Sequence, residues 1–189
     1  AWSSLKRLGA AGDGLVALRV ADDVVHAVIR SRAGSLLYET SRGASLKRFP
    51  IPRVTEISHS SLRIGSDGRA RLAYSDGRSL LFGVFTRTGF QVSAIPGTTA
   101  ADHEPVLVLD ASNRPHVAWY VPDWPAPSAR SGTYYATTAS GTWTASSARR
   151  FTRNVALPSL TLDVATGRPH ILLGLGEGGL KYYTKSAIG

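Results

Sequence analysis

Histidine is the residue type of this sequence best suited to acid–base chemistry or metal binding, and three of its five copies stand in similar contexts. Imidazole titrates near neutral pH and often binds metals. His116 and His170 both follow a Leu-Asp turn and the residues Arg-Pro, and His26 follows Asp-Val-Val. An active site is normally built once from different residues, so a histidine that recurs with its surroundings is expected to serve each repeat structurally.

The repeat emerges when His26, Arg71, His116 and His170 are taken as equivalent, at separations of 45, 45 and 54 residues. Each unit contains short runs of alternating, β-branched or leucine residues between turn residues, a pattern typical of strands. Four short strands in a period of about 40 to 50 residues indicate the blades of a β-propeller. One aromatic residue recurs in each third run, namely Tyr38, Phe82, Tyr135 and Tyr182, and packing between blades is its expected role.

The last unit ends after its third strand, and the N-terminus offers the missing fourth. Ser-Leu-Lys-Arg stands at 4–7 and again at 45–48, in the fourth strand of the first unit. We therefore predict an all-β fold, a single β-propeller domain over residues 1–189 with four blades of four antiparallel strands. The N-terminal strand would complete the C-terminal blade and remove its free edge. The expected blades cover 12–53, 57–98, 102–153, and 156–189 together with 1–9.

The repeated phrases resemble the blade repeats of bacterial β-propellers in the broad sialidase-like, or BNR-type, group. The resemblance is carried by Leu-Asp followed by Arg-Pro-His in the last two units, by Gly-Leu-Lys-Tyr-Tyr at 179–183 and by Gly-Thr-Trp at 141–143. It implies an architecture rather than an activity. Propellers of this group include glycosidases, but the Ser-x-Asp-x-Gly-x-Thr-Trp box of the sialidase type does not occur in this sequence.

The composition favours acidic partners. The net charge of +9 arises from 22 basic and 13 acidic residues and would attract an anionic polysaccharide, a cell-surface polymer or nucleic acid. The charge is spread along the chain without a recognised reading module, so specific nucleic-acid binding is not expected. The sequence has no apolar run long enough for a membrane span and no cysteine. With no methionine either, we expect a processed chain or an excised domain, and a secreted or cell-surface bacterial protein.

The third unit exceeds the 45-residue period by nine residues, and the excess falls at 121–131. Insertions in repeat proteins map to loops on one face, often the binding face. Trp124 stands between prolines and offers a flat apolar surface for a sugar ring or a protein. The inter-blade connections should share this face. The predicted ligand-binding residues are Asp123, Trp124, Arg130, His59, His103 and Glu104.

These patterns predict a non-catalytic binding module for a glycan or a protein surface, anionic ligands included. Asp102, His103, Glu104 and His59 are metal-binding types, but their spacing matches no standard site. We predict no catalytic residue, metal or cofactor. One alternative is a hydrolase or lyase acting on an anionic polysaccharide, and a second is an architectural propeller domain of a larger secreted or surface protein. The repeat spacing fits both a monomer with four blades and a dimer with a larger ring.

Overall fold

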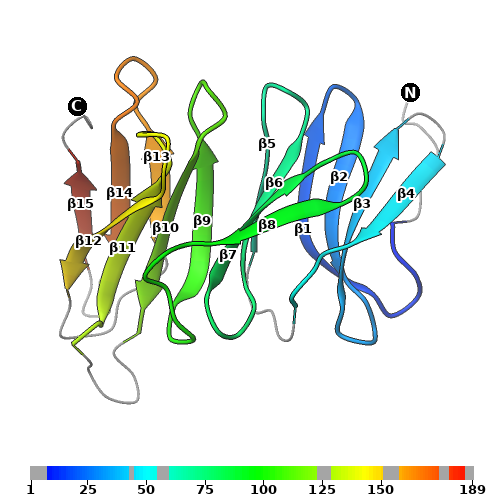
Figure 1. Cartoon of the computed structure of the whole chain (residues 1–189), viewed down its shortest axis with the longest axis horizontal. Helices are drawn as coiled ribbons and strands as arrows, with labels where there is room; N and C mark the ends of the chain where they lie inside the picture. Colours follow the sequence, from blue (N-terminus) through cyan, green and yellow to red (C-terminus); the bar gives the residue numbers. More distant parts are fainter. Residues whose placement is uncertain are drawn as a thin grey trace.

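A computed structural model of the chain consists of four antiparallel sheets that lie side by side in sequence order (Figure 1). Within every sheet the strands pair in the order of the chain. We call each sheet a blade and number the blades one to four. No helix in the described part of the chain has the length and apolar character of a membrane span. The structure describes residues 8–42, 45–54, 60–122, 129–150, 158–174 and 179–185, without the side chains at 42, 45, 149 and 150.

The strand bounds are as follows. Blade one contains β1 (Gly14–Ala21), β2 (Val24–Arg30), β3 (Leu36–Arg42) and β4 (Ser45–Pro50). Blade two contains β5 (Ser60–Ile64), β6 (Ala70–Ser75), β7 (Leu80–Phe85) and β8 (Phe90–Ala94). Blade three contains β9 (His103–Leu109), β10 (Pro115–Val121), β11 (Gly132–Thr137) and β12 (Thr144–Arg150). Blade four contains β13 (Ser159–Leu162), β14 (Pro169–Gly174) and β15 (Leu180–Thr184).

The predicted all-β architecture of antiparallel sheets is confirmed, whereas ring closure is not. Blades one and four lie at opposite ends of the row in Figure 1, and the described residues form no closed ring. The expected closing strand falls on residues 1–7, which lie outside the described residues. Closure of blade four by the N-terminus therefore stays a prediction.

The strand registers confirm that the four units are equivalent in detail. We call the four equivalent positions 26, 71, 116 and 170 the anchor positions. Two residues after each anchor stands a residue that pairs with the repeated aromatic on the third strand. These pairs are Val28 with Tyr38, Ala73 with Phe82, Ala118 with Tyr135 and Leu172 with Tyr182. Side chains alternate between the two faces of a strand, so all these positions lie on one face of each blade. We call it the forward face, because it packs against the next blade, and the opposite one the rear face.

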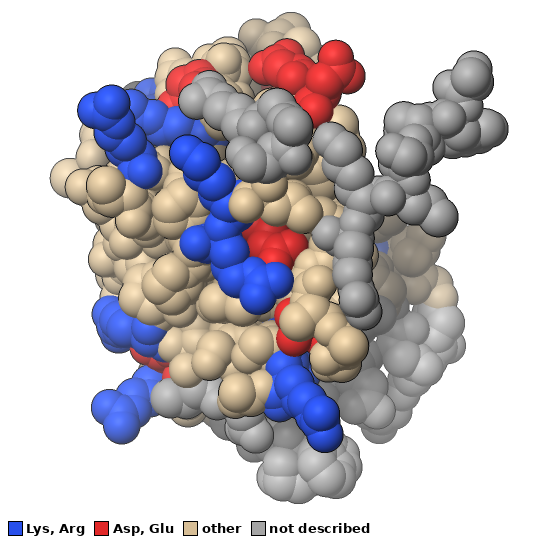
Figure 2. Space-filling model, turned by 90° about the vertical axis from the view of Figure 1, so that its right-hand side faces the viewer, with Lys and Arg blue, Asp and Glu red and all other residues tan. Residues whose placement is uncertain are grey.

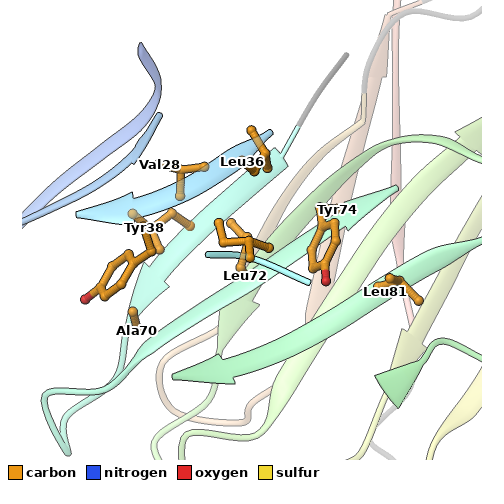
Figure 3. Close-up of a cluster of buried hydrophobic side chains, with 9 residues drawn as sticks. Val28, Leu36, Tyr38, Ala70, Leu72, Tyr74 and Leu81 are labelled. Atoms are coloured by element: carbon orange, nitrogen blue, oxygen red, sulfur yellow. The ribbon is translucent and has the colours of Figure 1, made fainter. Parts of the chain in front are cut away.

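The hydrophobic cores lie between blades, where a forward face meets a rear face. Figure 3 shows the first of them, in which Val28, Leu36 and Tyr38 of blade one meet Leu72 and other residues of blade two. The second and third cores are built in the same way. Ala73, Leu80 and Phe82 pack against Leu107, Val117 and Trp119, while Ala118 and Tyr135 pack against Leu160, Ile171 and Leu173.

Each repeated histidine bonds to the repeated tyrosine of its own blade. The Nδ1 atoms of His26 and His116 lie 2.5 Å from the hydroxyls of Tyr38 and Tyr135, and His170 pairs with Tyr182. In the first and third blades both members are buried at the interface with the next blade. A hydroxyl or imidazole buried there needs a polar partner, and each supplies one to the other. These contacts agree with the structural role expected for the histidine, and its partner is the tyrosine.

Blade two replaces both members of this pair at once. Arg71 takes the place of histidine and donates from Nη1 and Nη2 to the two carboxylate oxygens of Asp67, at 2.8 and 2.9 Å. Phe82 takes the place of tyrosine. An arginine that is satisfied by a carboxylate in its own turn needs no hydroxyl across the strand. The two exchanges therefore compensate each other.

Tyr135→Phe should lower the free energy of unfolding by about 1 to 3 kcal/mol, because it leaves Nδ1 of buried His116 without its hydrogen bond. Urea denaturation measures the change. Tyr120→Phe is the matched control, since the Tyr120 hydroxyl forms no hydrogen bond within the described part of the chain. We expect the control to change stability by less than about 0.5 kcal/mol. Equal effects of the two substitutions would contradict the role of the His–Tyr pair.

Candidate functional site

The strand connections lie at two opposite ends of the blades, which we call the turn face and the connection face. The turn face carries the β1–β2, β5–β6, β9–β10 and β13–β14 turns, at the top of Figure 1. The connection face carries the β6–β7 and β10–β11 loops and the segments that join one blade to the next. Of the predicted ligand-binding residues, His103, Glu104 and Arg130 are described and belong to the connection face.

On the connection face, Arg130 and Asp102 form the centre of a polar network. Arg130 Nη2 lies 3.1 Å from the carboxylate of fully buried Asp102 and donates to the Gly97 carbonyl at 2.8 Å. Asp102 also accepts hydrogen bonds from Trp119 Nε1 and from the backbone N–H of Thr99. The network ties the segment between blades two and three to the β10–β11 loop. The guanidinium of Arg130 is thus engaged in holding that loop.

The preceding interface contains the same link with its charges exchanged. Arg53, in the segment between blades one and two, lies 3.0 Å from Asp76 in the β6–β7 turn. In the next interface the carboxylate of Asp102 belongs to the connecting segment and the arginine to the loop. Both pairs attach a blade's entry segment to the loop between its second and third strands. The repetition supports a structural role for these ion pairs.

The other predicted residues of this face are only partly described. His103 lies beside Tyr120, with 6.3 Å between ring centroids, and the adjacent Glu104 helps to raise the pKa of Tyr120, whose burial is the larger cause. Asp123, Trp124 and His59 lie outside the described residues. Within the part that is described, no three histidine, aspartate or glutamate side chains gather into a possible metal site.

A pocket of about 890 Å³ opens on the turn face between blades three and four. The β9–β10 turn of blade three and the β13–β14 turn of blade four form its walls, and Ala139 and Ser140 add the β11–β12 turn. Four hydroxyl side chains and two arginines line the pocket together with small and branched apolar residues. These six are Ser112, Ser140, Thr161, Thr166, Arg114 and Arg168, and the polar lining also includes Asp110 and His116.

Aspartate builds both of the turns that line this pocket. Asp110 Oδ1 accepts the N–H groups of Ser112 and Arg114 at 2.9 and 2.8 Å, and Asp163 Oδ1 accepts the N–H of Thr166 at 2.7 Å. Burial favours the protonated form of Asp110, but its hydrogen bonds with Arg114 outweigh burial and lower the pKa of this carboxyl. Asp110 is therefore an anion at neutral pH.

The corresponding space between blades two and three is occupied by side chains. The Asn113 side chain accepts a hydrogen bond from the Ser66 N–H at 2.8 Å and donates one to Ser66 Oγ at 2.9 Å, which joins the two turns. A Cβ on Gly65 would lie 2.2 Å from Arg71 and 2.5 Å from Asn113, so only glycine permits this close approach. No such bridge joins Asp110 and its neighbours to the β13–β14 turn among the described hydrogen bonds.

The two arginines of the pocket differ in their partners. Arg114 donates from Nε to Asp110 Oδ2 and from Nη1 to the Ala139 carbonyl, both at 2.6 Å, so its guanidinium is held in place. Arg168 is exposed, and none of the described carboxylates lies within ion-pair distance of its side chain. Arg168 is thus a cation at the pocket wall that can bind an anionic group from solution.

His116 forms part of the pocket wall near the Asp110 carboxylate. Its Nδ1 binds the Tyr135 hydroxyl, and its Nε2 lies 3.7 Å from Asp110 Oδ2, too far for a hydrogen bond. Burial lowers the pKa of His116 although the Asp110 anion opposes the shift, and burial raises the pKa of Tyr135 to about 12. Both side chains are therefore neutral at pH 7, as expected for a structural pair.

The two aspartates near this pocket belong to the turns that surround it. Glycoside hydrolysis commonly requires two carboxyl groups across the bond, whereas Asp110 and Asp163 here serve their own turns and only Asp110 lines the pocket. Sequence reasoning did not single out Arg168 or the pocket. One signal was present, because the Asp163 turn is one residue longer than the Asp110 turn before its Arg-Pro-His.

Comparisons with known proteins support the fold. No protein-family model matches the sequence, and no curated protein is similar to it. A solved protein of unknown function from Dyadobacter fermentans DSM 18053 matches with 12% identity and a TM-score of 0.59, over 88% of this chain and 51% of that one. A triple arginine-to-alanine mutant of AofleA from Arthrobotrys oligospora matches with 13% identity and a TM-score of 0.62, over 94% and 54%.

A weaker match is "Bifunctional GH43-CE" of Bacteroides eggerthii, with 16% identity and a TM-score of 0.49, over 92% of this chain and 24% of that one. At this TM-score the match contributes nothing to the argument for fold or function. The two stronger matches, together with the stacked antiparallel blades, show a β-propeller-like fold. The chain spans about half the length of these two proteins.

Acidification should destabilise the protein through His116 in a definite pH range. The pKa of His116 is lowered from 6.5 in the folded state, chiefly by burial, so the unfolded chain takes up this proton more readily. The contribution of neutral His116 to the free energy of unfolding is complete above pH 6.5. It is lost as the pH falls through 6.5 toward the lower pKa of the folded state. His116→Gln should therefore flatten the dependence of the urea midpoint on pH between about 7 and 5.

Asn113→Ser is the control for this measurement, because Asn113 lies in the same turn and does not titrate. It should lower the urea midpoint at every pH and keep the wild-type slope. The turn carboxylates contribute at lower pH, since the pKa of Asp110 is lowered from 3.8. A wild-type slope in His116→Gln would show that this histidine does not titrate as inferred.

Proposed function

We propose that this protein is a non-catalytic binding module for an acidic glycan, which it takes up in the pocket between blades three and four. The observation that carries the proposal is Arg168, an exposed cation without a described carboxylate partner, at the wall of a pocket rich in hydroxyl groups. The protein's net charge of +9 favours the approach of a polyanion.

The pocket's size and lining suit a saccharide. A volume of about 890 Å³ lies within the range of about 300 to 1,000 Å³ that is usual for small-ligand sites. Ser112, Ser140, Thr161 and Thr166 can each donate and accept hydrogen bonds, as the hydroxyls of a sugar require. Val164 and Pro169 add apolar surface for the C–H faces of a ring.

The acidic character of the ligand follows from the two arginines. Arg168 can bind a carboxylate or sulfate through two parallel N–H bonds, a geometry that lysine cannot offer. Arg114 is fixed by Asp110 and by a carbonyl, so it contributes a positioned positive charge rather than a mobile one. A uronic acid or a sulfated sugar is the simplest unit that satisfies both arginines and the hydroxyls.

The predicted contact residues of the connection face remain a second candidate surface. Asp123 and Trp124 would present the β10–β11 loop to a protein or a glycan, with Arg130 and Asp102 holding the base of that loop. The pocket lies on the opposite face, so substitutions can separate the two surfaces. Secretion or cell-surface location in a bacterium belongs to the same proposal, because acidic polysaccharides are met outside the cell.

Two other functions are distinguished by direct measurements. A hydrolase or lyase would release new reducing ends or unsaturated sugars from the acidic polysaccharide, whereas a binding module leaves it intact. An architectural domain would bind no saccharide and would contact other domains of a larger protein. The second carboxyl group that glycoside hydrolysis usually needs is not among the residues lining the pocket, which favours binding.

Isothermal titration with oligogalacturonate and with heparin fragments tests the proposal, with neutral dextran oligomers as the reference ligand. We expect one of the acidic saccharides to bind and the neutral one not to bind. Arg168→Gln should weaken binding by about 10- to 100-fold, the effect of losing one charge-assisted hydrogen-bonded contact. Its urea midpoint should stay unchanged, because Arg168 is exposed.

Arg87→Gln is the matched control. Arg87 is also exposed and also belongs to the turn face, in the turn between β7 and β8, but it does not line the pocket. Its affinity should remain within about twofold of wild type. Equal loss in both variants would indicate non-specific attraction to positive charge, and undiminished affinity in Arg168→Gln would refute this site.

A further inference from the structure

Blade four exposes a forward face that the repeat elsewhere keeps buried. Leu172, Leu180 and Tyr182 are 40%, 71% and 59% exposed. By strand register, their equivalents in blade one are Val28, Leu36 and Tyr38. All three of these residues belong to the core between blades one and two. In blades one to three, every residue at these three positions is at most 7% exposed. Three large apolar side chains on one face therefore form a packing surface that no described blade covers.

Blade one exposes the complementary position at the other end of the row. Leu18 is 39% exposed, whereas its register equivalents Leu62, Leu107 and Leu160 are at most 6% exposed. These three leucines belong to the three inter-blade cores, each on the rear face of its blade. Leu18 is thus the rear-face leucine of a blade that lacks a preceding blade among the described residues.

Part of this rear face is covered by the segment that enters blade one. The Gly9 N–H donates to buried Glu39 at 2.9 Å, and a Cβ at Gly9 would lie 3.5 Å from Ile29. In the next junctions the entering segments place Ile51 and Ile95 in the cores beside Tyr74 and Trp119, which are the equivalents of Ile29. The segment that enters blade one contacts its rear face as the segments that enter blades two and three contact theirs. The rear face of blade one therefore has the features of a face that receives a preceding blade.

We propose that two copies of this chain associate end to end, with the forward face of blade four in one copy packed on the rear face of blade one in the other. The two faces are halves of an interface that the chain already forms three times internally. Within one copy they lie at opposite ends of the row (Figure 1), so one copy does not join them in this structure. Two such contacts related by a two-fold axis would close a ring of eight blades.

A second copy fits these faces better than an unrelated partner. The exposed residues of blade four repeat the types found in the internal cores, with Tyr182 where Tyr38 and Tyr135 are buried. The solved structures that share the fold are about twice as long, since this chain covers 51% and 54% of them, and two copies would supply that length. Figure 2 views the blade-one end, where uncharged surface lies between basic side chains and a smaller number of acidic ones.

The mass of the protein in solution, measured by sedimentation or light scattering, tests the proposal. The buffer should contain about 0.3 M salt, because salt screens the repulsion between two copies of charge +9. The wild-type protein should have twice the chain mass at micromolar concentration. Leu180→Glu and Leu18→Glu should each have the mass of one chain, because either variant places a charge in both contacts. Both residues are exposed in one copy, so the variants should still fold.

Mixing the two variants should restore a species of two chains, because one contact then joins the intact blade four of one variant to the intact blade one of the other. Thr88→Glu is the control, since Thr88 is exposed in the β7–β8 turn of blade two, away from both contact faces. It should keep the wild-type mass. A wild-type protein that has the mass of one chain at all concentrations overturns the proposal.

Cross-linking distinguishes the geometry, since the sequence contains no cysteine. Leu172 and Leu18 are the equivalents of Ala118 and Leu160, which share the third core. A mixture of Leu172→Cys and Leu18→Cys chains should give a cross-linked pair with a short bis-maleimide, and neither variant should do so alone. Pairing of Leu172→Cys with itself overturns the head-to-tail contact, and cross-linking within one chain of the double variant shows a ring of four blades instead.

Discussion

The packing of one blade on the next is the contact on which every other feature of this protein depends. Each blade carries apolar side chains on both faces, so no blade can bury its own surface alone. A buried leucine or valine stabilises by about 1.5 to 3 kcal/mol, and each of the three cores collects its residues from two adjacent blades. Stability is therefore shared between neighbours, as in other repeat architectures.

The polar groups fit into gaps that this packing leaves. The His–Tyr pairs satisfy polar groups that are buried on the forward face, and blade two reaches the same result with Arg71 and Asp67. At the connection face, Arg53 with Asp76 and Arg130 with Asp102 join each entry segment to a loop with opposite arrangements of charge. Both arrangements place one cation and one carboxylate in contact at this junction.

The sequence was sufficient to predict the repeated parts of the fold. The recurrence of the anchor position gave the four sheets, because hydrophobic alternation and turn residues reappear at each period. It also indicated a structural histidine, and the simultaneous change to Arg71 and Phe82 in unit two was a visible sign of the tyrosine partner. What could not be predicted depends on single departures from the repeat. The pocket arises because Asn113 bridges the turns of blades two and three while no described residue bridges those of blades three and four.

Hydrogen exchange on a single copy, measured with Leu180→Glu at low concentration, tests most directly whether blades are stabilised by their neighbours. Blades two and three have a blade on each side, so the amides of β6 and β10 should exchange most slowly. The amides of β14, whose forward face has no described neighbour, should exchange faster than their equivalents in β10 by at least about tenfold. Equal protection of β14 and β10 in a protein with the mass of one chain would contradict this dependence of each blade on its neighbours.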